Sequence, residues 1–385
     1  MAQERRRQIV PGARKDFSRP NDINDEYLEP IMRPPPPRPV HGRGASNNPA
    51  NRFEALALEP DDNLPNDEEA PARTTKFYRD FTRSIIAHND SPDVGFESSV
   101  NPYRGCEHGC IYCYARPTHE YLGFSAGLDF ESRIMVKEDA PELLAAELSK
   151  SSWKPQVIAM SGVTDPYQPI ERRLKLTRRC LEVFARFRNP VGIITKNALV
   201  ARDIDLLGEL AVHHAAAVNI SVTSLDPKLQ RILEPRTATP RARLDAIGQL
   251  RAAGIPVGVM VAPIIPGLTD HEAPAILQAC AEAGAQWAGY TVVRLPFAVA
   301  PLFERWLEEH FPDRKEKILG RIRHLRGGEK LNDPQFKSRM VGEGIFAEQI
   351  RALFEAGCKR AGIGERVHLS TAAFRRPNEQ LRLFG

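Results

Sequence analysis

The feature that most constrains this chain is a run of three cysteines within eight residues, Cys106, Cys110 and Cys113. The 385-residue chain has six cysteines, so half of its thiols lie in one short stretch. With three residues between the first two cysteines and two between the second pair, a tight loop can direct all three sulfurs to one point. Iron–sulfur clusters are usually held by four cysteine thiolates. Three thiolates therefore predict a cluster in which one iron has no protein ligand.

A structural zinc site is the main alternative, with His108 as its fourth ligand. However, His108 lies between two of the cysteines and would have to fold back over its own loop, and no second Cys/His pair follows at zinc-finger spacing. Three unrelated buried thiols are a further alternative, but free cysteines are normally scattered along a chain. We therefore predict a cluster, and we expect Cys180, Cys280 and Cys358 to be buried as small apolar side chains.

The three cysteines resemble the cluster-binding triad of the radical S-adenosylmethionine (SAM) superfamily, in which the cofactor's amino and carboxylate groups chelate the fourth iron. Tyr112 and Tyr114, on either side of Cys113, extend the resemblance to the branch of spore photoproduct lyase and "DNA repair photolyase" proteins, over about residues 95–300. The resemblance implies a [4Fe–4S] cluster on the three cysteines and S-adenosyl-L-methionine as cofactors. It also implies an external electron donor and cleavage of SAM to a 5′-deoxyadenosyl radical.

Composition indicates a globular protein outside the membrane, with 42% hydrophobic and 26% charged residues. No run of eighteen apolar residues is present, and the polar N-terminus lacks the apolar core of a signal peptide. We therefore expect a cytoplasmic protein with no membrane partner, in a reducing compartment that suits cluster thiolates. The net charge of +4 permits a polyanionic partner without demanding one. Basic runs at 172–179, 314–317, 321–326 and 375–376 are either solvated helix faces or, if they share one face, a phosphate-binding track.

Strand and helix patterns alternate along the chain. We expect strands at about 98–103, 157–161, 191–196, 217–223, 256–265 and 287–294, with helices at about 172–187, 201–210, 240–253, 272–283 and 299–310. Apolar strands that alternate with helices predict a parallel sheet covered by helices. Six such units predict an α/β fold of the partial (β/α)6 TIM-type barrel class, which the resembled superfamily also has.

Four regions are expected along the chain. They are an extended N-terminal segment at 1–75, the barrel at 76–310, a helical C-terminal region at 311–375 and a tail at 376–385. The N-terminal segment contains a proline run at 34–39 and an acidic stretch at 60–69. Between them, residues 41–53 combine glycines, asparagines and arginines, and this stretch could be a flexible linker, dock on the barrel or contact nucleic acid.

Polar residues that follow the strands of a parallel barrel meet at one face, where chemistry occurs. Candidate cofactor-binding residues here are Tyr112, Thr164, Asp165, Glu171, Lys196, Ser221 and Arg236. The resemblance implies that Lys196 binds the SAM carboxylate and that the segment around Asp165 lies near its amino group. The alternatives are a lysine on the rim and a turn before Pro166. After the sixth strand, Tyr290 and Arg294 are expected on the substrate side.

Gly162 stands where spore photoproduct lyase carries its hydrogen-donor cysteine, so the resemblance does not extend to that lyase's own reaction. A final hydrogen donor would then come from another group. Tyr114 and Tyr167 are the candidate catalytic residues for this role, with the cofactor as the alternative.

The chain ends in Gln380, Leu381, Arg382, Leu383, Phe384 and Gly385, which is similar to the peptide by which bacterial replication and repair proteins bind the DNA sliding clamp. Leu381, Leu383 and Phe384 would be apolar anchors and Gln380 the hydrogen-bonding residue. The alternative is a terminus that packs on its own domain.

Together with the photolyase-like resemblance, this tail predicts a radical SAM enzyme that acts on nucleic acid, in DNA repair. Modification of RNA or protein by the same chemistry is one alternative. A non-enzymatic iron–sulfur or zinc protein associated with DNA is the other.

Overall fold

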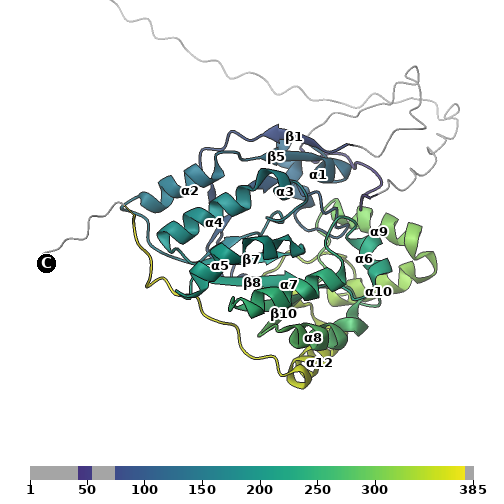
Figure 1. Ribbon diagram of the computed structural model, residues 1–385. Coiled ribbons are helices and arrows are strands. Elements are labelled where there is room, and N and C mark those ends of the chain that lie inside the picture. Colours follow the sequence, from purple (N-terminus) through teal and green to yellow (C-terminus); the bar gives the residue numbers. More distant parts are fainter. Residues whose placement is uncertain (1–41, 54–73, 378–385) are drawn as a thin grey trace, which may run out of the picture. The chain divides into compact units, whose positions relative to one another are not determined.

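The computed structural model describes residues 42–53 and 74–377, all within one compact unit, Arg38–Gly385 (Figure 1). The proline run, the acidic stretch and the clamp-like residues Gln380, Leu381, Leu383 and Phe384 lie outside the described residues.

A sheet of seven strands forms the centre of the described structure, in the order β10-β9-β8-β7-β6-β3-β2. Its strands are β2 (Ile86–His88), β3 (Ser98–Val100), β6 (Ile158–Met160), β7 (Val191–Thr195), β8 (Ala216–Ser221), β9 (Val257–Ile264) and β10 (Ala288–Val292). All neighbours pair in parallel except β2, which pairs with β3 in antiparallel register. The sheet ends in β10 and β2 rather than closing, so the prediction of a partial barrel with six parallel strands is confirmed.

Helices connect the parallel strands, as the alternating pattern predicts. The main ones are α2 (Ala140–Ser149), α4 (Leu176–Phe187), α5 (Ile204–Ala211), α7 (Pro240–Ala252), α8 (Ala273–Ala283) and α9 (Val299–His310). The helix predicted at 172–187 is interrupted, because Lys175 adopts φ +53° and separates α3 (Glu171–Leu174) from α4. The short helix α6 (Pro227–Leu233) was not predicted, although Asp226 caps it and proline occupies its first position.

A second sheet, which the sequence patterns did not predict, supports the cysteine stretch. It has the order β1-β5-β4 and consists of β1 (Lys76–Arg79), β4 (Tyr103–Arg104) and β5 (Arg133–Val136). The strand predicted at 98–103 is therefore two strands, of which β3 pairs with β6 and β4 pairs with β5. The chain thus leaves the main sheet before Cys106, and the cysteine loop begins directly after β4.

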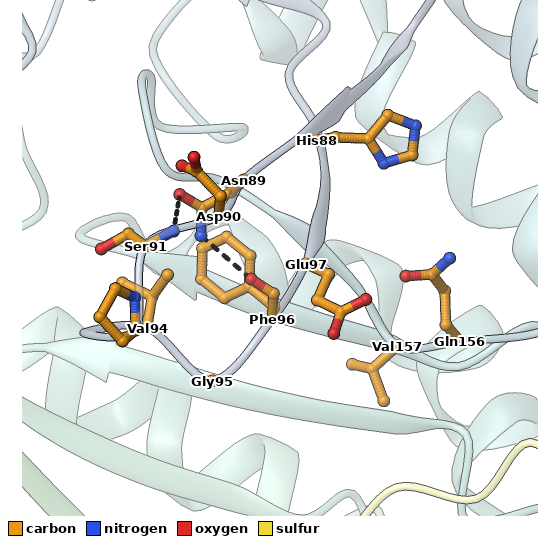
Figure 2. A pocket seen from close by; sticks show the side chains of 11 residues that line it. His88, Asn89, Asp90, Ser91, Val94, Gly95, Phe96, Glu97, Gln156 and Val157 are labelled. Atoms are coloured by element: carbon orange, nitrogen blue, oxygen red, sulfur yellow. Dashed lines mark hydrogen bonds between the residues drawn. The ribbon is translucent and has the colours of Figure 1, made fainter.

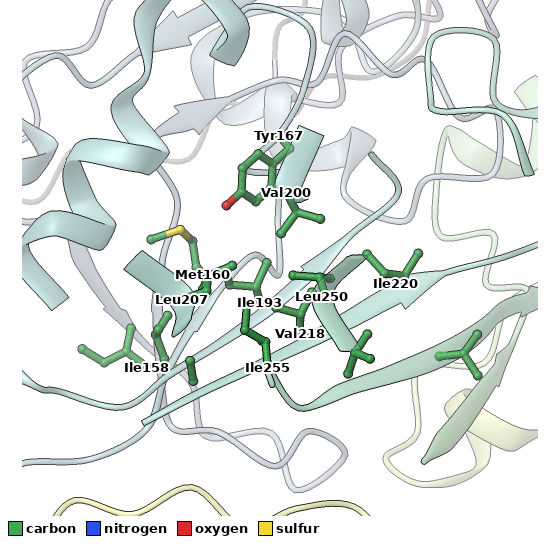
Figure 3. Packing of buried hydrophobic residues seen from close by; sticks show 14 of the residues in the cluster. Ile158, Met160, Tyr167, Ile193, Val200, Leu207, Val218, Ile220, Leu250 and Ile255 are labelled. Carbon is green, nitrogen blue, oxygen red and sulfur yellow. The ribbon is translucent and has the colours of Figure 1, made fainter. Parts of the chain in front are cut away.

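Aliphatic side chains from the strands and helices form the main core (Figure 3). Ile158, Ile193 and Val218 come from β6, β7 and β8, and Leu207 and Leu250 come from α5 and α7. Each of these side chains is fully buried. The core therefore holds the sheet rigidly beneath the strand ends that carry the polar candidates.

The C-terminal region is helical only as far as Ala361. It contains α10 (Lys315–Leu325), α11 (Ser338–Val341) and α12 (Gly344–Ala361), and α12 packs against α8 (Figure 1). Cys180 and Cys280 are buried as expected, but Cys358 is only half-buried because much of α12 faces solvent. In the described residues, no helix is long and apolar enough to span a membrane.

After α12 the chain runs past the starts of several strands. The amide of Gly364 donates to Gln286 before β10, that of Ser370 to His214 before β8, and that of Arg375 to Phe187 before β7. The cysteines follow the opposite, carboxyl ends of the parallel strands. The described chain therefore ends at the side of the sheet away from the cysteine loop.

Candidate active site at the cysteine loop

The cysteine loop depends on two glycines that adopt left-handed backbone conformations. Gly105 has φ +76° and Gly109 has φ +67°. A Cβ atom at Gly105 would lie 2.9 Å from the carbonyl oxygen of Phe130, and one at Gly109 would lie 2.7 Å from Oε2 of Glu131. Only glycine fits both conditions. The loop can therefore turn tightly enough to gather its three thiols.

The three thiols are electrostatic neighbours in a buried setting. Burial raises the pKa of Cys110 well above its usual range, and Glu234 and the other two thiols raise it further. Burial and Cys106 raise the pKa of Cys113 to about 11. Metal ligation requires thiolates, and the positive charge of bound iron offsets both effects. Three soft sulfur donors in such a place fit an iron–sulfur cluster.

His108 does not complete a zinc site with the cysteines. Its Nδ1 atom lies 3.4 Å from Oδ2 of Asp165, and its Nε2 atom lies 3.2 Å from Nδ2 of Asn197. Burial would lower the pKa of His108, but Asp165 and Cys106 raise it to about 10. Across residues 42–53 and 74–377, no group of three or more His, Cys, Asp and Glu side chains is arranged to hold a metal ion.

A buried arginine clamps the loop from within. Arg116 donates to the carbonyl oxygen of Cys110 from Nε at 3.1 Å and from Nη2 at 2.9 Å, and to that of Gly109 at 3.3 Å. It forms an ion pair with Glu131, and both side chains are fully buried. The two residues therefore fix the path of the loop at Gly109 and Cys110. Neither was predicted, because nothing in the local sequence marks a buried arginine.

The segment 42–53, whose role the sequence left open, docks on this loop. The amides of Gly44 and Ala45 donate to Oε2 and Oε1 of Glu131, at 3.0 and 2.9 Å. A Cβ atom on Gly44 would overlap the carbonyl oxygen of Gly109. Further along, Arg52 pairs with Glu120 at 2.7 Å. We call this segment the strap, since it lies over the cysteine loop.

The loop is also tied to the segment that follows β6. Glu107 accepts from the amide of Ile170 at 2.8 Å and pairs with Arg236 at 3.1 Å. Asp165 accepts from the hydroxyl of Thr195 and from the amide of Lys196, both at 2.7 Å. Burial would raise the pKa of Asp165, but His108 and these hydrogen bonds hold it below its usual value. The ends of β6 and β7 therefore meet at the cysteine loop, as the barrel topology predicts.

Thr164 and Glu171 have protein partners. The hydroxyl of Thr164 donates to the carbonyl oxygen of Tyr103 at 3.3 Å. Glu171 is fully buried, accepts from the amide of Thr177 at 3.0 Å and pairs with Arg202 at 2.8 Å. In this arrangement Glu171 joins the starts of α3 and α4, and it also accepts from the hydroxyl of Tyr103 in β4 at 2.5 Å.

Glu234, which the sequence did not single out, connects several candidates. It accepts hydrogen bonds from Tyr112 and from Thr223, the latter at 2.6 Å. It pairs with Lys196 at 3.3 Å and with the buried Arg243. Burial would raise its pKa, but Arg243 and Lys196 outweigh this and hold it well below the usual range. An ionised carboxylate thus orients Tyr112 and Lys196 at the mouth of the barrel.

The remaining candidates fall into two groups. Tyr114 lies beside Cys113, is 48% exposed and donates to the carbonyl oxygen of Gly162. Ser221, at the end of β8, is buried, and its carbonyl oxygen accepts from Arg243 at 2.8 Å. Tyr167 instead lies in the hydrophobic core, with its hydroxyl donated to Asp203 at 3.1 Å (Figure 3). Tyr167 is therefore fully buried, whereas Tyr114 is half exposed.

Two hollows lie on the described surface, and the second is lined by residues that contact the cysteine loop. One of about 1060 Å³ lies around the β2–β3 hairpin, lined by residues that include His88, Phe96 and Gln156 (Figure 2). Another of about 540 Å³ is lined in part by Arg172 and Arg236. None of the cysteines lines either hollow. The cysteine loop and its aromatic neighbours therefore remain the candidate site.

Comparison with known proteins supports this assignment. A model of the radical SAM superfamily matches residues 100–280. An uncharacterised protein of Mycobacterium tuberculosis is 39% identical over 232 residues, which cover 60% of this chain and 67% of that protein. The radical SAM Nalpha-GlyT isomerase of Pseudomonas phage M6 is 28% identical over 174 residues, which cover 45% of this chain and 34% of the isomerase.

Among solved structures, spore photoproduct lyase complexed with dinucleoside spore photoproduct has a similar fold. The TM-score is 0.53 at 16% identity, and the match covers 74% of this chain and 79% of the lyase. The matched family region, 100–280, contains the three cysteines and four of the six parallel strands in full. The chain belongs to the radical SAM superfamily, and its cofactors are a [4Fe–4S] cluster and S-adenosylmethionine.

Proposed function

We propose that this radical SAM enzyme acts on nucleic acid and takes part in DNA repair. Spore photoproduct lyase, with which it shares the fold, is complexed with a dinucleoside spore photoproduct in one solved structure. That likeness supports a nucleotide substrate. The lyase's own reaction is not part of the proposal, because the sequence resemblance implies Gly162 at the position of the lyase's hydrogen-donor cysteine. We also propose that an external electron donor reduces the cluster.

The observation that carries the proposal is a cluster of exposed aromatic rings beside the cysteine loop. Phe53 and Tyr121 stack with centroids 4.8 Å apart, and the guanidinium of Arg52 lies 3.7 Å from the ring centroid of Phe297. Phe53, Tyr121 and Phe297 are 56%, 73% and 64% exposed. We call these four residues the aromatic patch. Exposed rings combined with arginine are what proteins use to stack unpaired bases.

Phe297 adds a sign of functional constraint. It has φ +49°, a left-handed conformation that is unfavourable for a bulky residue. Such strain persists where the surroundings enforce it and concentrates at functional sites. Phe297 follows β10 at the carboxyl ends of the strands, so the aromatic patch lies where a substrate would approach the cluster.

Different residues have different proposed roles at the site. Cys106, Cys110 and Cys113 hold the cluster. When both are bound, the cluster and SAM supply the electron-transfer and hydrogen-abstraction chemistry of the superfamily. Lys196, held by Glu234, offers a cation for the carboxylate of SAM.

The other candidate residues keep their proposed places around SAM. Tyr112, Thr164, Asp165, Ser221 and Arg236 remain proposed cofactor contacts. For Glu171 we propose a supporting role, because its carboxylate is already bonded to Arg202 and to the start of α4.

Tyr114 is the proposed final hydrogen donor. It follows Cys113 directly, its hydroxyl reaches the carbonyl oxygen of Gly162, and its ring is half exposed toward the substrate side. A tyrosine has an ordinary pKa of about 10, so the phenol keeps its hydrogen at neutral pH. Tyr167 does not share these features, since it is enclosed by the core.

An assay of SAM cleavage tests the proposal. Anaerobically reconstituted enzyme with a chemical reductant should release 5′-deoxyadenosine, and ultraviolet-irradiated DNA should bind and change the rate. Cys110→Ala should abolish both the visible cluster absorbance and the cleavage, while Cys358→Ala, a cysteine on α12, should keep both. Cleavage that ignores DNA, with no DNA binding, would contradict the nucleic acid substrate and favour RNA or protein modification.

The clamp-like tail suggests a partner for the same role. The described chain approaches its end along the starts of the strands, on the opposite side from the cysteine loop, and this supports a tail that can bind a partner while the site is occupied. We propose that Gln380, Leu381, Leu383 and Phe384 bind the DNA sliding clamp. Pull-down with a sliding clamp should succeed with the full chain and fail with a chain that ends at Glu379, and equal recovery of the two would contradict it.

A further inference from the structure

Arg294 lies at the cysteine loop without an acidic partner. It follows β10, the sixth parallel strand, and its guanidinium carbon is 5.2 Å from the ring centroid of Tyr114. Tyr114 is the residue after Cys113, so the guanidinium is a direct neighbour of the candidate site. Within residues 42–53 and 74–377, no carboxylate lies within ion-pair distance of Arg294, whose hydrogen bond goes from Nη1 to the thioether sulfur of Met340 at 3.7 Å.

The neighbouring side chains do not neutralise the positive charge of Arg294. Its Nε atom is buried and has no hydrogen-bond partner in the described structure. Arg339 is close by and ion-pairs with Asp93, so that carboxylate is already used. Asp333 is likewise engaged by the hydroxyl of Ser338 and the amide of Gln335. Burial and the like charge of Arg339 lower the pKa of Arg294.

A half-buried cation with an unsatisfied hydrogen-bond donor lowers the stability of the folded protein unless a ligand pairs with it. Buried charges in folded proteins are paired, and unsatisfied buried donors are rare. Three guanidiniums gather here, because Arg326 also lies in this region, where it donates to the carbonyl oxygens of Val293 and Ser338. The described residues supply two carboxylates nearby, so an anion is the missing partner.

We propose that Arg294 binds a phosphate group of the nucleic acid substrate, an inference that rests on the proposed function. Guanidinium groups recognise phosphates through paired hydrogen bonds. Arg294 lies against Tyr114, the exposed tyrosine, whereas Lys196 lies against Tyr112, the buried one, with its ammonium 5.6 Å from that ring centroid. The two cations therefore serve different sides of the cysteine loop. Phe297 of the aromatic patch is three residues further along the chain from Arg294.

The salt dependence of DNA binding tests this contact. The holoenzyme would be titrated with a fluorescein-labelled, ultraviolet-irradiated oligonucleotide at several salt concentrations. Arg294→Gln should weaken binding about tenfold and lower the slope of log K against log salt by roughly 0.7 to 0.9, the loss of one phosphate contact. Arg294→Lys, which keeps the charge, should restore the slope and only part of the affinity.

Arg241→Gln is the matched control, because Arg241 lies on α7 outside the basic runs and pairs with Asp245 at 2.9 Å, so its loss should leave both affinity and slope unchanged. Intact visible absorbance and DNA-independent SAM cleavage in Arg294→Gln would show that the site remains folded. If Arg294→Gln keeps the wild-type slope of log K against log salt, this inference is overturned but the proposed function is not. A raised KM for SAM with unchanged DNA binding would also overturn it, by assigning Arg294 to the SAM carboxylate. Failure of the wild-type enzyme to bind DNA would instead refute the proposed function.

Discussion

The ammonium nitrogen of Lys196 lies 3.3 Å from a carboxylate oxygen of Glu234, and the two residues follow different strands of the sheet. Glu234 also pairs with Arg243, which is fully buried, and accepts a hydrogen bond from Tyr112. One carboxylate therefore links the cation proposed for SAM to the tyrosine beside Cys113. The orientation of the cofactor pocket should depend on this single side chain.

Glu234→Ala should be severely destabilising. It leaves Arg243 buried without its carboxylate, and breaking a buried pair in this way costs about 3–5 kcal/mol. The free energy of unfolding of the apoprotein in urea measures the effect. Asp245→Asn is the control, because Asp245 pairs with Arg241 at the surface and such pairs contribute about 0–1 kcal/mol. Equal losses in the two variants would refute the role of Glu234.

The same residue predicts a pH dependence. The folded protein holds the pKa of Glu234 below the ordinary value of 4.5. The stabilisation is therefore fully present above about pH 4.5 and is lost as the pH falls through the lower, folded pKa. The difference in unfolding free energy between wild type and Glu234→Gln should shrink below that pH. A difference that stays constant on acidification would show that Glu234 is not ionised in the folded state.

Gly44→Ala should detach the strap from the cysteine loop. The added methyl group would overlap the carbonyl oxygen of Gly109, and overpacking of this kind costs about 1–3 kcal/mol. Glu131 would then lose the amides of Gly44 and Ala45, and the loop would hold its cluster less firmly. Bleaching of the visible absorbance by an iron chelator should be faster than in wild type.

Gly208→Ala provides the control for the strap. Gly208 lies in α5, where a Cβ atom meets nothing within 4 Å, so alanine should be neutral or stabilise the helix by up to about 1 kcal/mol. Its bleaching rate should equal that of wild type. An unchanged rate in Gly44→Ala as well would mean that the strap does not protect the cluster.

The sequence predicted the parallel strands β6 to β10 because each is a short, largely apolar run between helix patterns. The second sheet was missed for physical reasons, since β1 is exposed along its whole length and β4 has only two residues. Neither has the alternation or apolar run that marks a strand. The split of the predicted strand at 98–103 followed from this omission.

The candidate site was predictable where residues close in sequence act together. The cysteine spacing, with its two glycines, encodes the loop. The pairs Arg116–Glu131 and Glu234–Arg243 were missed, because burial of a charged residue depends on a partner that only the folded chain brings near. Tyr167 shows how far a strand-end position leaves a side chain open, since a tyrosine after a strand can turn into the core as well as into the mouth.

Phe297→Ala tests the aromatic patch directly. Stacking on one base contributes about 1–3 kcal/mol, so removal of this ring should weaken binding of a fluorescent single-stranded oligonucleotide about 5- to 150-fold. Cluster absorbance and DNA-independent SAM cleavage should not change, because Phe297 touches neither cysteine nor proposed SAM residues in the contacts described. Phe81→Ala is the matched control: Phe81 is 78% exposed and Arg79 lies 5.2 Å from its ring centroid, but it follows β1 in the other sheet. If the two variants bind the oligonucleotide with equal affinity, the aromatic patch has no special part in substrate binding.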